Sequence, residues 1–178
     1  MYALERPPHL STTALDEVHA PRIRELHDYW KSRCSDVAPP PRSAIEPADI
    51  RRLLPYLILS ELTADPFRIT YRLVGTAVAR AHGDDFTHRD HASVASLIDS
   101  GIDQAYRRVL ATASPVYGKT GLYVGDRSWI PFEYAIFPLS DDGVTGIKCL
   151  AIQCTNGPEI QSWSNHSELD LPAAQPRP

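Results

Sequence analysis

The stretch SGIDQAYRRVLATASP, residues 100–115, carries the clearest structural signal in the chain. Its apolar side chains recur at helical spacing, at Ile102, Ala105, Tyr106, Val109, Leu110 and Ala113. Ser100 suits the N-cap of such a helix, and Pro115 cannot continue it. The spacing therefore predicts an amphipathic helix from residue 101 to about residue 113.

The segments on both sides of this helix have the character of strands. Before it, residues 56–62 are apolar and β-branched, and in residues 67–74 apolar side chains alternate with polar ones. A turn at residues 64–66 joins the two segments into a predicted hairpin with one buried face. Three more strands are expected after the helix, at about residues 116–124, 129–139 and 145–155, with turns at Gly125-Asp126 and Asp141-Asp142-Gly143.

Two helices are expected before the first strand. One begins at Pro21 and runs to about Cys34, with a narrow apolar stripe of Ile23, Leu26 and Trp30. A short one runs from Pro47 to Pro55. The resulting order of elements predicts an α+β fold with one antiparallel sheet.

Composition limits the class of protein further. The chain has 178 residues, a length typical of one domain, and its net charge of −4 does not favour a nucleic-acid-binding surface. Cys34, Cys149 and Cys154 form no CxxC pair, which is typical of a reducing compartment and of inert buried thiols. The first ten residues do not have the regions of a signal peptide, so a cytoplasmic location is expected.

Proline usage divides the chain into three parts. Nine of the 16 prolines fall in the first 66 residues, and none falls between Phe67 and Ser114. We therefore expect a helical extension with Pro-rich connectors at 1–55, loosely ordered over residues 1–20. A domain at 56–156 and a disordered polar tail at 157–178 complete the division.

The densest cluster of candidate metal ligands is HGDDFTHRDH, residues 82–91. Its imidazoles and carboxylates could hold zinc or iron, or His82, His88 or His91 could bind haem. The alternative is a polar connection between helices, and the spacing matches no closed metal site. The sequence names no cofactor.

Aromatic residues give the candidate ligand-binding site. The five members of the set are expected on elements that face one another across the sheet and the long helix: Tyr71, Tyr106, Tyr117, Phe132 and Tyr134. Such rings, with hydroxyls that need partners, suit a small-molecule pocket, although they are equally compatible with a plain core.

The order of elements and several local strings resemble a bacterial PAS-like subfamily, made of a PAS domain with a short N-terminal helical extension. The matching strings are LHDYW (26–30), AIEPADIRRLLP (44–55), FRITYRLVGT (67–76), GDDFT (83–87), AYRRV (105–109), SPVYG (114–118), FEY (132–134) and FPLSDDG (137–143). The resemblance implies a five-stranded antiparallel sheet, in spatial order 2-1-5-4-3, with helices on one face.

The same resemblance implies a sensory or regulatory domain that binds a small molecule or a signalling protein and catalyses no reaction. The helical middle has no cysteine for a flavin adduct, and the long helix has no histidine for haem. Two alternatives remain open. One is a small isomerase-like or dehydratase-like enzyme that uses the same cavity, and the other is an interaction module that forms a homodimer through the stripe of the N-terminal helix.

Overall fold

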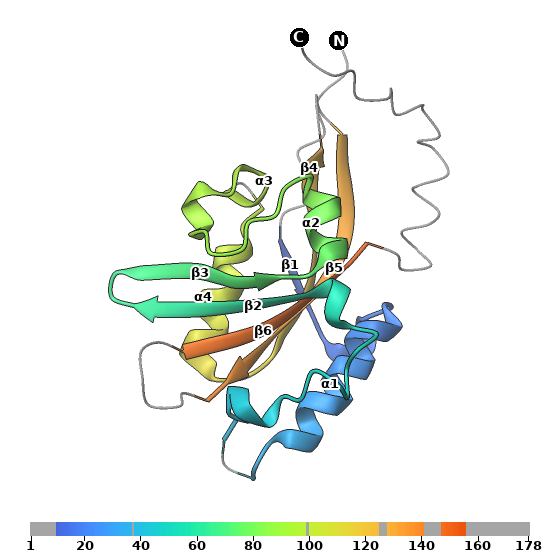
Figure 1. Cartoon of the computed structure of the whole chain (residues 1–178), viewed down its shortest axis with the longest axis vertical. Helices are drawn as coiled ribbons and strands as arrows, with labels where there is room; N and C mark the ends of the chain where they lie inside the picture. The colour runs from blue at the N-terminus through green and yellow to red at the C-terminus, as the bar shows by residue number, and fades with distance from the viewer. Residues whose placement is uncertain (1–9, 37, 99, 125–127, 141–146, 156–178) are drawn as a thin grey trace.

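The computed structural model describes residues 10–36, 38–98, 100–124, 128–140 and 147–155 (Figure 1). The turns expected at 125–126 and 141–143, and the tail at 157–178, lie outside these ranges. No helix in the described ranges is both long and apolar enough to cross a bilayer.

One antiparallel sheet of six strands forms the centre of the molecule, in the order β1-β4-β5-β6-β2-β3. The strands are β1 (Ser11–Thr13), β2 (Leu57–Ala64), β3 (Phe67–Val74), β4 (Val116–Val124), β5 (Ser128–Leu139) and β6 (Ile147–Cys154). Without β1, the remaining strands follow the order implied by the resemblance. The expectation of five strands was therefore one strand short.

The extra strand β1 pairs with the edge strand β4, so the expectation of a loosely ordered segment at 1–20 was wrong for these residues. Thr12 lies opposite Gly118. A Cβ at Gly118 would lie 2.0 Å from the carbonyl oxygen of Ser11 and 2.5 Å from the hydroxyl oxygen of Tyr134. The strand can approach this closely because the position opposite it is a glycine.

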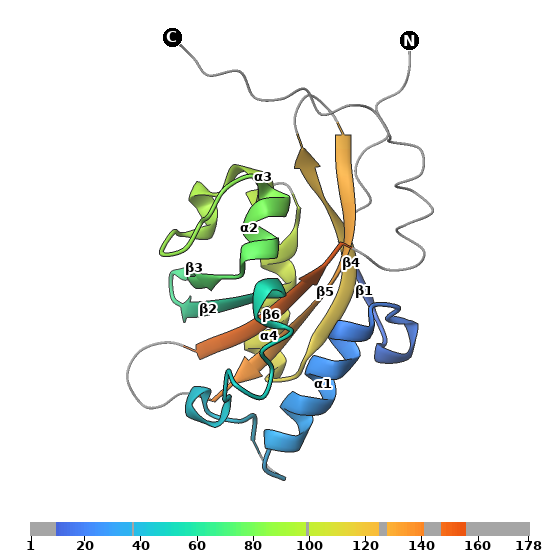
Figure 2. The same cartoon turned by 45° about the vertical axis from the view of Figure 1, so that its right-hand side comes forward.

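Helices cover both faces of the sheet (Figure 2). They are α1 (Pro21–Arg33), α2 (Thr76–His82), α3 (Ala95–Ile98) and α4 (Ile102–Thr112), with 3₁₀ turns at Leu15–Glu17, Arg42–Ala44, Leu54–Tyr56 and His91–Ser93. One buried cluster joins α2, α3 and α4 to one face, which we call the α4 face. A second cluster joins α1 to the opposite face, which we call the α1 face.

The long helix α4 confirms the spacing argument. Its residues Ile102, Ala105, Tyr106 and Val109 are buried against the sheet. The N-cap is Gly101, one residue later than expected, and Ser100 Oγ instead accepts the backbone N–H of Ile102 at 3.3 Å.

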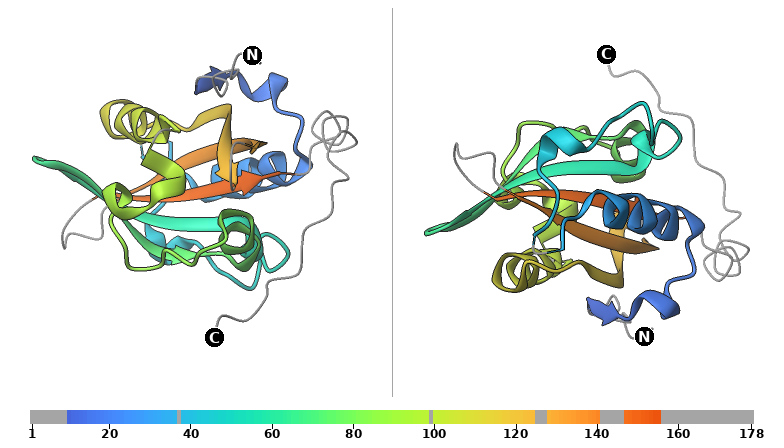
Figure 3. Two further views of the ribbon diagram at one scale, coloured as in Figure 1. Left: turned by 90° about the horizontal axis from the view of Figure 1, so that it is seen from above. Right: turned by 90° about the horizontal axis from the view of Figure 1, so that it is seen from below.

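The apolar stripe of α1 packs within its own chain. Ile23, Leu26 and Trp30 are buried, and the indole N–H of Trp30 donates to the carbonyl oxygen of Pro138 at 2.9 Å. Seen from below, α1 runs along β5 and β6 (Figure 3). The prediction that this stripe forms a dimer seam was therefore wrong, because the sheet of the same chain already covers it.

The short helix expected from Pro47 to Pro55 was also wrong. The segment consists of turns followed by a 3₁₀ helix, Leu54–Tyr56. Its N–H groups make i→i+3 bonds, such as Leu53 to Ile50 at 2.8 Å. Both of these side chains are buried on the α1 face, so tertiary packing overrides the local helical propensity of this segment.

Strand β6 places its two cysteines on opposite faces, as the strand period predicts. Cys149 lies in the cluster of the α4 face and Cys154 in that of the α1 face. The β5–β6 register is regular, whereas the register of β2 against β3 shifts between Leu59 and Ser60. Gln153 therefore belongs to the α4 face.

Candidate ligand-binding site

A small cavity lies between the α4 face and the helices that cover it. Its volume is about 20 Å³, which is room for about one water molecule. Four of the five aromatic residues singled out in the sequence line it: Tyr71, Tyr106, Phe132 and Tyr134. The remaining lining is aliphatic except for Gln153, with contributions from Ile58, Leu97, Ile102, Ile136, Ala151 and Ile152.

The fifth aromatic residue, Tyr117, lies on the α1 face and does not line this cavity. Its hydroxyl oxygen is 2.6 Å from Nδ1 of His27, and its ring packs edge-on against Phe137 with centroids 6.0 Å apart. Burial raises the pKa of Tyr117 to about 12. The expectation that it joins the other aromatics was wrong because its position in β4 turns it toward α1.

The tyrosine hydroxyls at the cavity already have partners. The Tyr106 and Ser60 hydroxyls are 2.9 Å apart, and the Tyr71 hydroxyl is 2.8 Å from Nδ1 of His91. The Tyr134 hydroxyl donates to the carbonyl oxygen of Ser11 at 3.4 Å. Burial raises the pKa of Tyr71 and of Tyr106, so both phenols remain neutral.

Gln153 is a site residue that the aromatic pattern missed. It is 5% exposed, and its Oε1 lies 3.0 Å from Nε2 of His82. Nδ1 of His82 lies in turn 2.8 Å from the hydroxyl oxygen of Ser96. The available signal was a polar side chain that follows four uncharged residues, Cys149 to Ile152, in a largely apolar strand.

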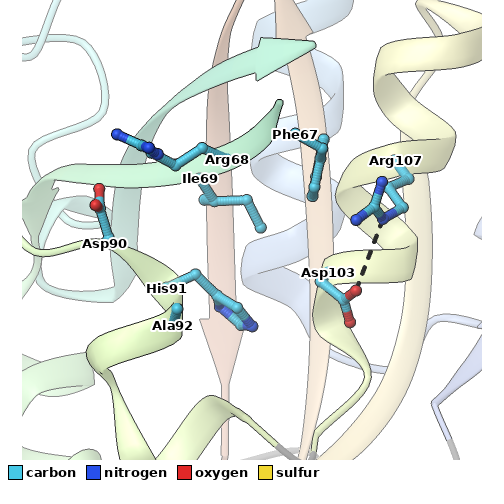
Figure 4. A pocket seen from close by; sticks show the side chains of 8 residues that line it. All are labelled: Phe67, Arg68, Ile69, Asp90, His91, Ala92, Asp103 and Arg107. Atoms are coloured by element: carbon cyan, nitrogen blue, oxygen red, sulfur yellow. Dashed lines mark ion pairs between the residues drawn. The ribbon is translucent and has the colours of Figure 1, made fainter. Parts of the chain in front are cut away.

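An open cleft of about 580 Å³ adjoins the cavity. Figure 4 shows Asp103 and Arg107 of α4 on one side of it and His91 on the other, with Phe67 and Ile69 of β3 beside them. The Arg107 guanidinium lies 3.8 Å from the centroid of the Phe67 ring and 3.8 Å from the Asp103 carboxylate.

A hydrogen bond between Tyr71 and His91 joins the lining of the cavity to the lining of the cleft. His91 lines the cleft, whereas Tyr71 lines the cavity. Burial lowers the pKa of His91, although the nearby Asp103 carboxylate acts in the opposite direction. At neutral pH the bond between the two compartments is therefore made by an uncharged pair.

The three histidines of the candidate metal segment do not converge. His82 contacts Gln153 and Ser96, His91 contacts Tyr71, and His88 has a positive φ of 65°. Within the described ranges, no group of three or more His, Cys, Asp and Glu side chains is placed to hold a metal ion.

The enzyme alternative requires a carboxylate or imidazole in the cavity. Among the described residues the cavity lining contains neither, and His91 and Asp103 lie in the cleft outside it. The buried carboxylate of Glu133 lies on the α1 face, where the backbone N–H groups of His19 and Ala20 donate to it.

A single antiparallel sheet, with a long helix and short helical segments over one face and a small cavity between them, places the chain in the class of α+β domains. The family comparison agrees with this class, because a model of the PAS domain matches residues 18–152. That match covers most of the chain, so the chain belongs to the PAS domain family, and the resemblance seen in the sequence is confirmed. The matched region includes α1. No curated protein matches the chain.

Proposed function

We propose that this chain is a sensory domain that binds a small molecule on the α4 face and catalyses no reaction of its own. PAS domains in general act in sensing and signal transduction. The observation that carries the proposal is the cavity bounded by Tyr71, Tyr106, Phe132 and Tyr134, together with the cleft that opens beside it. Aromatic walls with few polar groups are typical of small-molecule sites.

The wall around this site is built from short elements. Leu97 comes from α3, which has four residues, and His91 begins a three-residue 3₁₀ helix. Short segments outside a sheet have few cooperative hydrogen bonds and open at low free-energy cost. A ligand that enlarges the cavity would therefore reposition this wall, and a protein partner that contacts the wall would detect the change.

Native mass spectrometry combined with an absorbance spectrum of the purified full chain tests the proposal. We expect a bound mass on the wild-type chain and on Ala111→Leu, which enlarges an exposed helix residue. Ala151→Leu should fill the cavity and remove the bound mass while the far-ultraviolet circular dichroism stays unchanged. A wild-type chain that carries nothing and is stabilised by no member of a metabolite panel would contradict the proposal.

A further inference from the structure

Gln153 has an unusual environment among the polar side chains of the cavity. The hydroxyls of Tyr71, Tyr106 and Tyr134 are all hydrogen-bonded. The side-chain amide nitrogen of Gln153, Nε2, is buried and has no hydrogen-bond partner in the part of the chain that the structure describes. A buried donor without an acceptor is costly, and native proteins usually pair such groups with a ligand or water.

In the orientation that the structure gives the amide of Gln153, His82 pairs with its oxygen end. Oε1 of Gln153 can only accept, so Nε2 of His82 carries the proton that lies between them. Nδ1 of His82 then accepts the hydroxyl hydrogen of Ser96. Burial lowers the pKa of His82 and keeps this neutral form at neutral pH. His82 thus holds the amide with its NH₂ group available to the cavity.

The rest of the lining limits the charge of the occupant. None of the described residues around the cavity carries a charged side chain. An ion placed there would lose its hydration without gaining a counterion, which is strongly unfavourable. The cavity therefore favours an uncharged, mainly apolar molecule.

We infer that the cavity takes a neutral, mainly apolar ligand that presents one hydrogen-bond acceptor to Nε2 of Gln153, and that His82 is the positioning residue for this amide. The inference rests on the proposed function and specifies its ligand chemistry. The cavity has room for about one water molecule, so a larger ligand must displace part of the wall, which includes Leu97, as it enters.

Two probes of matched shape test the inference: acetophenone, and α-methylstyrene, in which C=CH₂ replaces C=O. Each is titrated into the full chain by NMR, and the ratio of the two affinities is measured. Gln153→Met keeps the length of the side chain but not the donor. In this variant the affinity for acetophenone relative to α-methylstyrene should fall about tenfold. Gln104→Met, the same substitution at an exposed position of α4, should keep the wild-type ratio.

The wild-type chain supplies a second measurement that does not depend on the folding of a variant. Acetophenone should shift the side-chain NH₂ resonances of Gln153, and α-methylstyrene should shift them much less. For His82, His82→Leu should lose the acetophenone preference, whereas His82→Gln, which can still donate to Oε1 of Gln153, should retain most of it.

Three outcomes would overturn the inference. If both probes bind and Gln153→Met leaves the ratio unchanged, the α4-face site stands but Gln153 does not recognise the acceptor. If neither probe binds and a single ordered water occupies Nε2, the amide is only a water site. If the purified chain also carries nothing and no metabolite stabilises it, the proposed function fails as well.

Discussion

Two buried hydroxyls meet beneath α4, those of Tyr106 on the helix and Ser60 on β2. They are 2.9 Å apart, and both side chains are buried. A buried hydroxyl that loses its partner pays the cost of desolvation without compensation. This hydrogen bond therefore links α4 to β2 through Tyr106, whose side chain also lines the cavity.

Replacing one member of this pair should cost more than replacing both. We expect Tyr106→Phe to lower the free energy of unfolding by about 1–2 kcal/mol, because the Ser60 hydroxyl is left buried and unpaired. Urea unfolding measures this change. The double variant Tyr106→Phe/Ser60→Ala should recover most of the loss, and two strictly additive losses would show that the hydroxyls are not coupled.

The helix α1 is held at its N-terminal end by a carboxylate from the sheet. Glu133 accepts the backbone N–H of Ala20 at 2.6 Å and that of His19 at 3.1 Å, and Lys119 Nζ lies 3.5 Å from the same carboxylate. The N–H groups around the start of a helix have no partners within the helix. Glu133 supplies such partners and so attaches the N-terminal extension to β5.

Loss of this carboxylate should loosen α1 selectively. We expect Glu133→Ala to lower the free energy of unfolding by about 2–3 kcal/mol, since hydrogen bonds to a charged group are lost. Hydrogen exchange should become faster in α1 while it changes little in β3. Glu133→Gln keeps one acceptor oxygen and should have a smaller effect, and equal protection of α1 in all three proteins would contradict this role.

Histidines with lowered pKa values lie on both faces of the molecule. Burial lowers the pKa of His27 on the α1 face and of His82 and His91 on the α4 face, each from an ordinary value of 6.5. The unfolded chain therefore binds more protons than the folded chain just below that pH. Side chains on both faces of the sheet therefore contribute to the pH dependence of stability.

Stability should accordingly be highest above pH 6.5 and should fall as the pH drops toward the lowered pKa values. Urea unfolding at about pH 7.5 and about pH 5 measures the difference. Asp85, whose pKa is lowered by hydrogen bonds from Thr87, titrates at still lower pH and does not contribute in this window. His82→Gln should reduce the dependence, and an unchanged unfolding midpoint across this range would contradict the assignment.

The elements that the sequence predicted correctly have strong local signals. Strand β3 matches the alternating segment at both ends, and α4 matches the helical spacing to within one or two residues. Elements without such signals were missed. Strand β1 has three residues, and it exists because Gly118 leaves room for it on the edge of β4.

The candidate site was partly predictable for the same reason. Alternation and helical period predicted that Tyr71, Tyr106, Phe132 and Tyr134 share one cavity. Sequence alone could not show that the three tyrosine hydroxyls are hydrogen-bonded to groups elsewhere in the chain. Whether the side chains of Tyr117 and Gln153 reach the cavity depends on which helices cover each face of their strands. That layer is formed by segments distant in the sequence.

By itself, the sequence determined the period of each long element, the α+β class and the PAS family, because hydrophobic periodicity and order along the chain are local properties. Only the tertiary structure decided that α1 covers the second face of the sheet and that its apolar stripe is buried there. It also decided that Gln153 lines the cavity and that its side-chain amide nitrogen is buried without a partner among the described residues. Partners for a side chain are assigned by contacts between distant segments, and no local pattern specifies them.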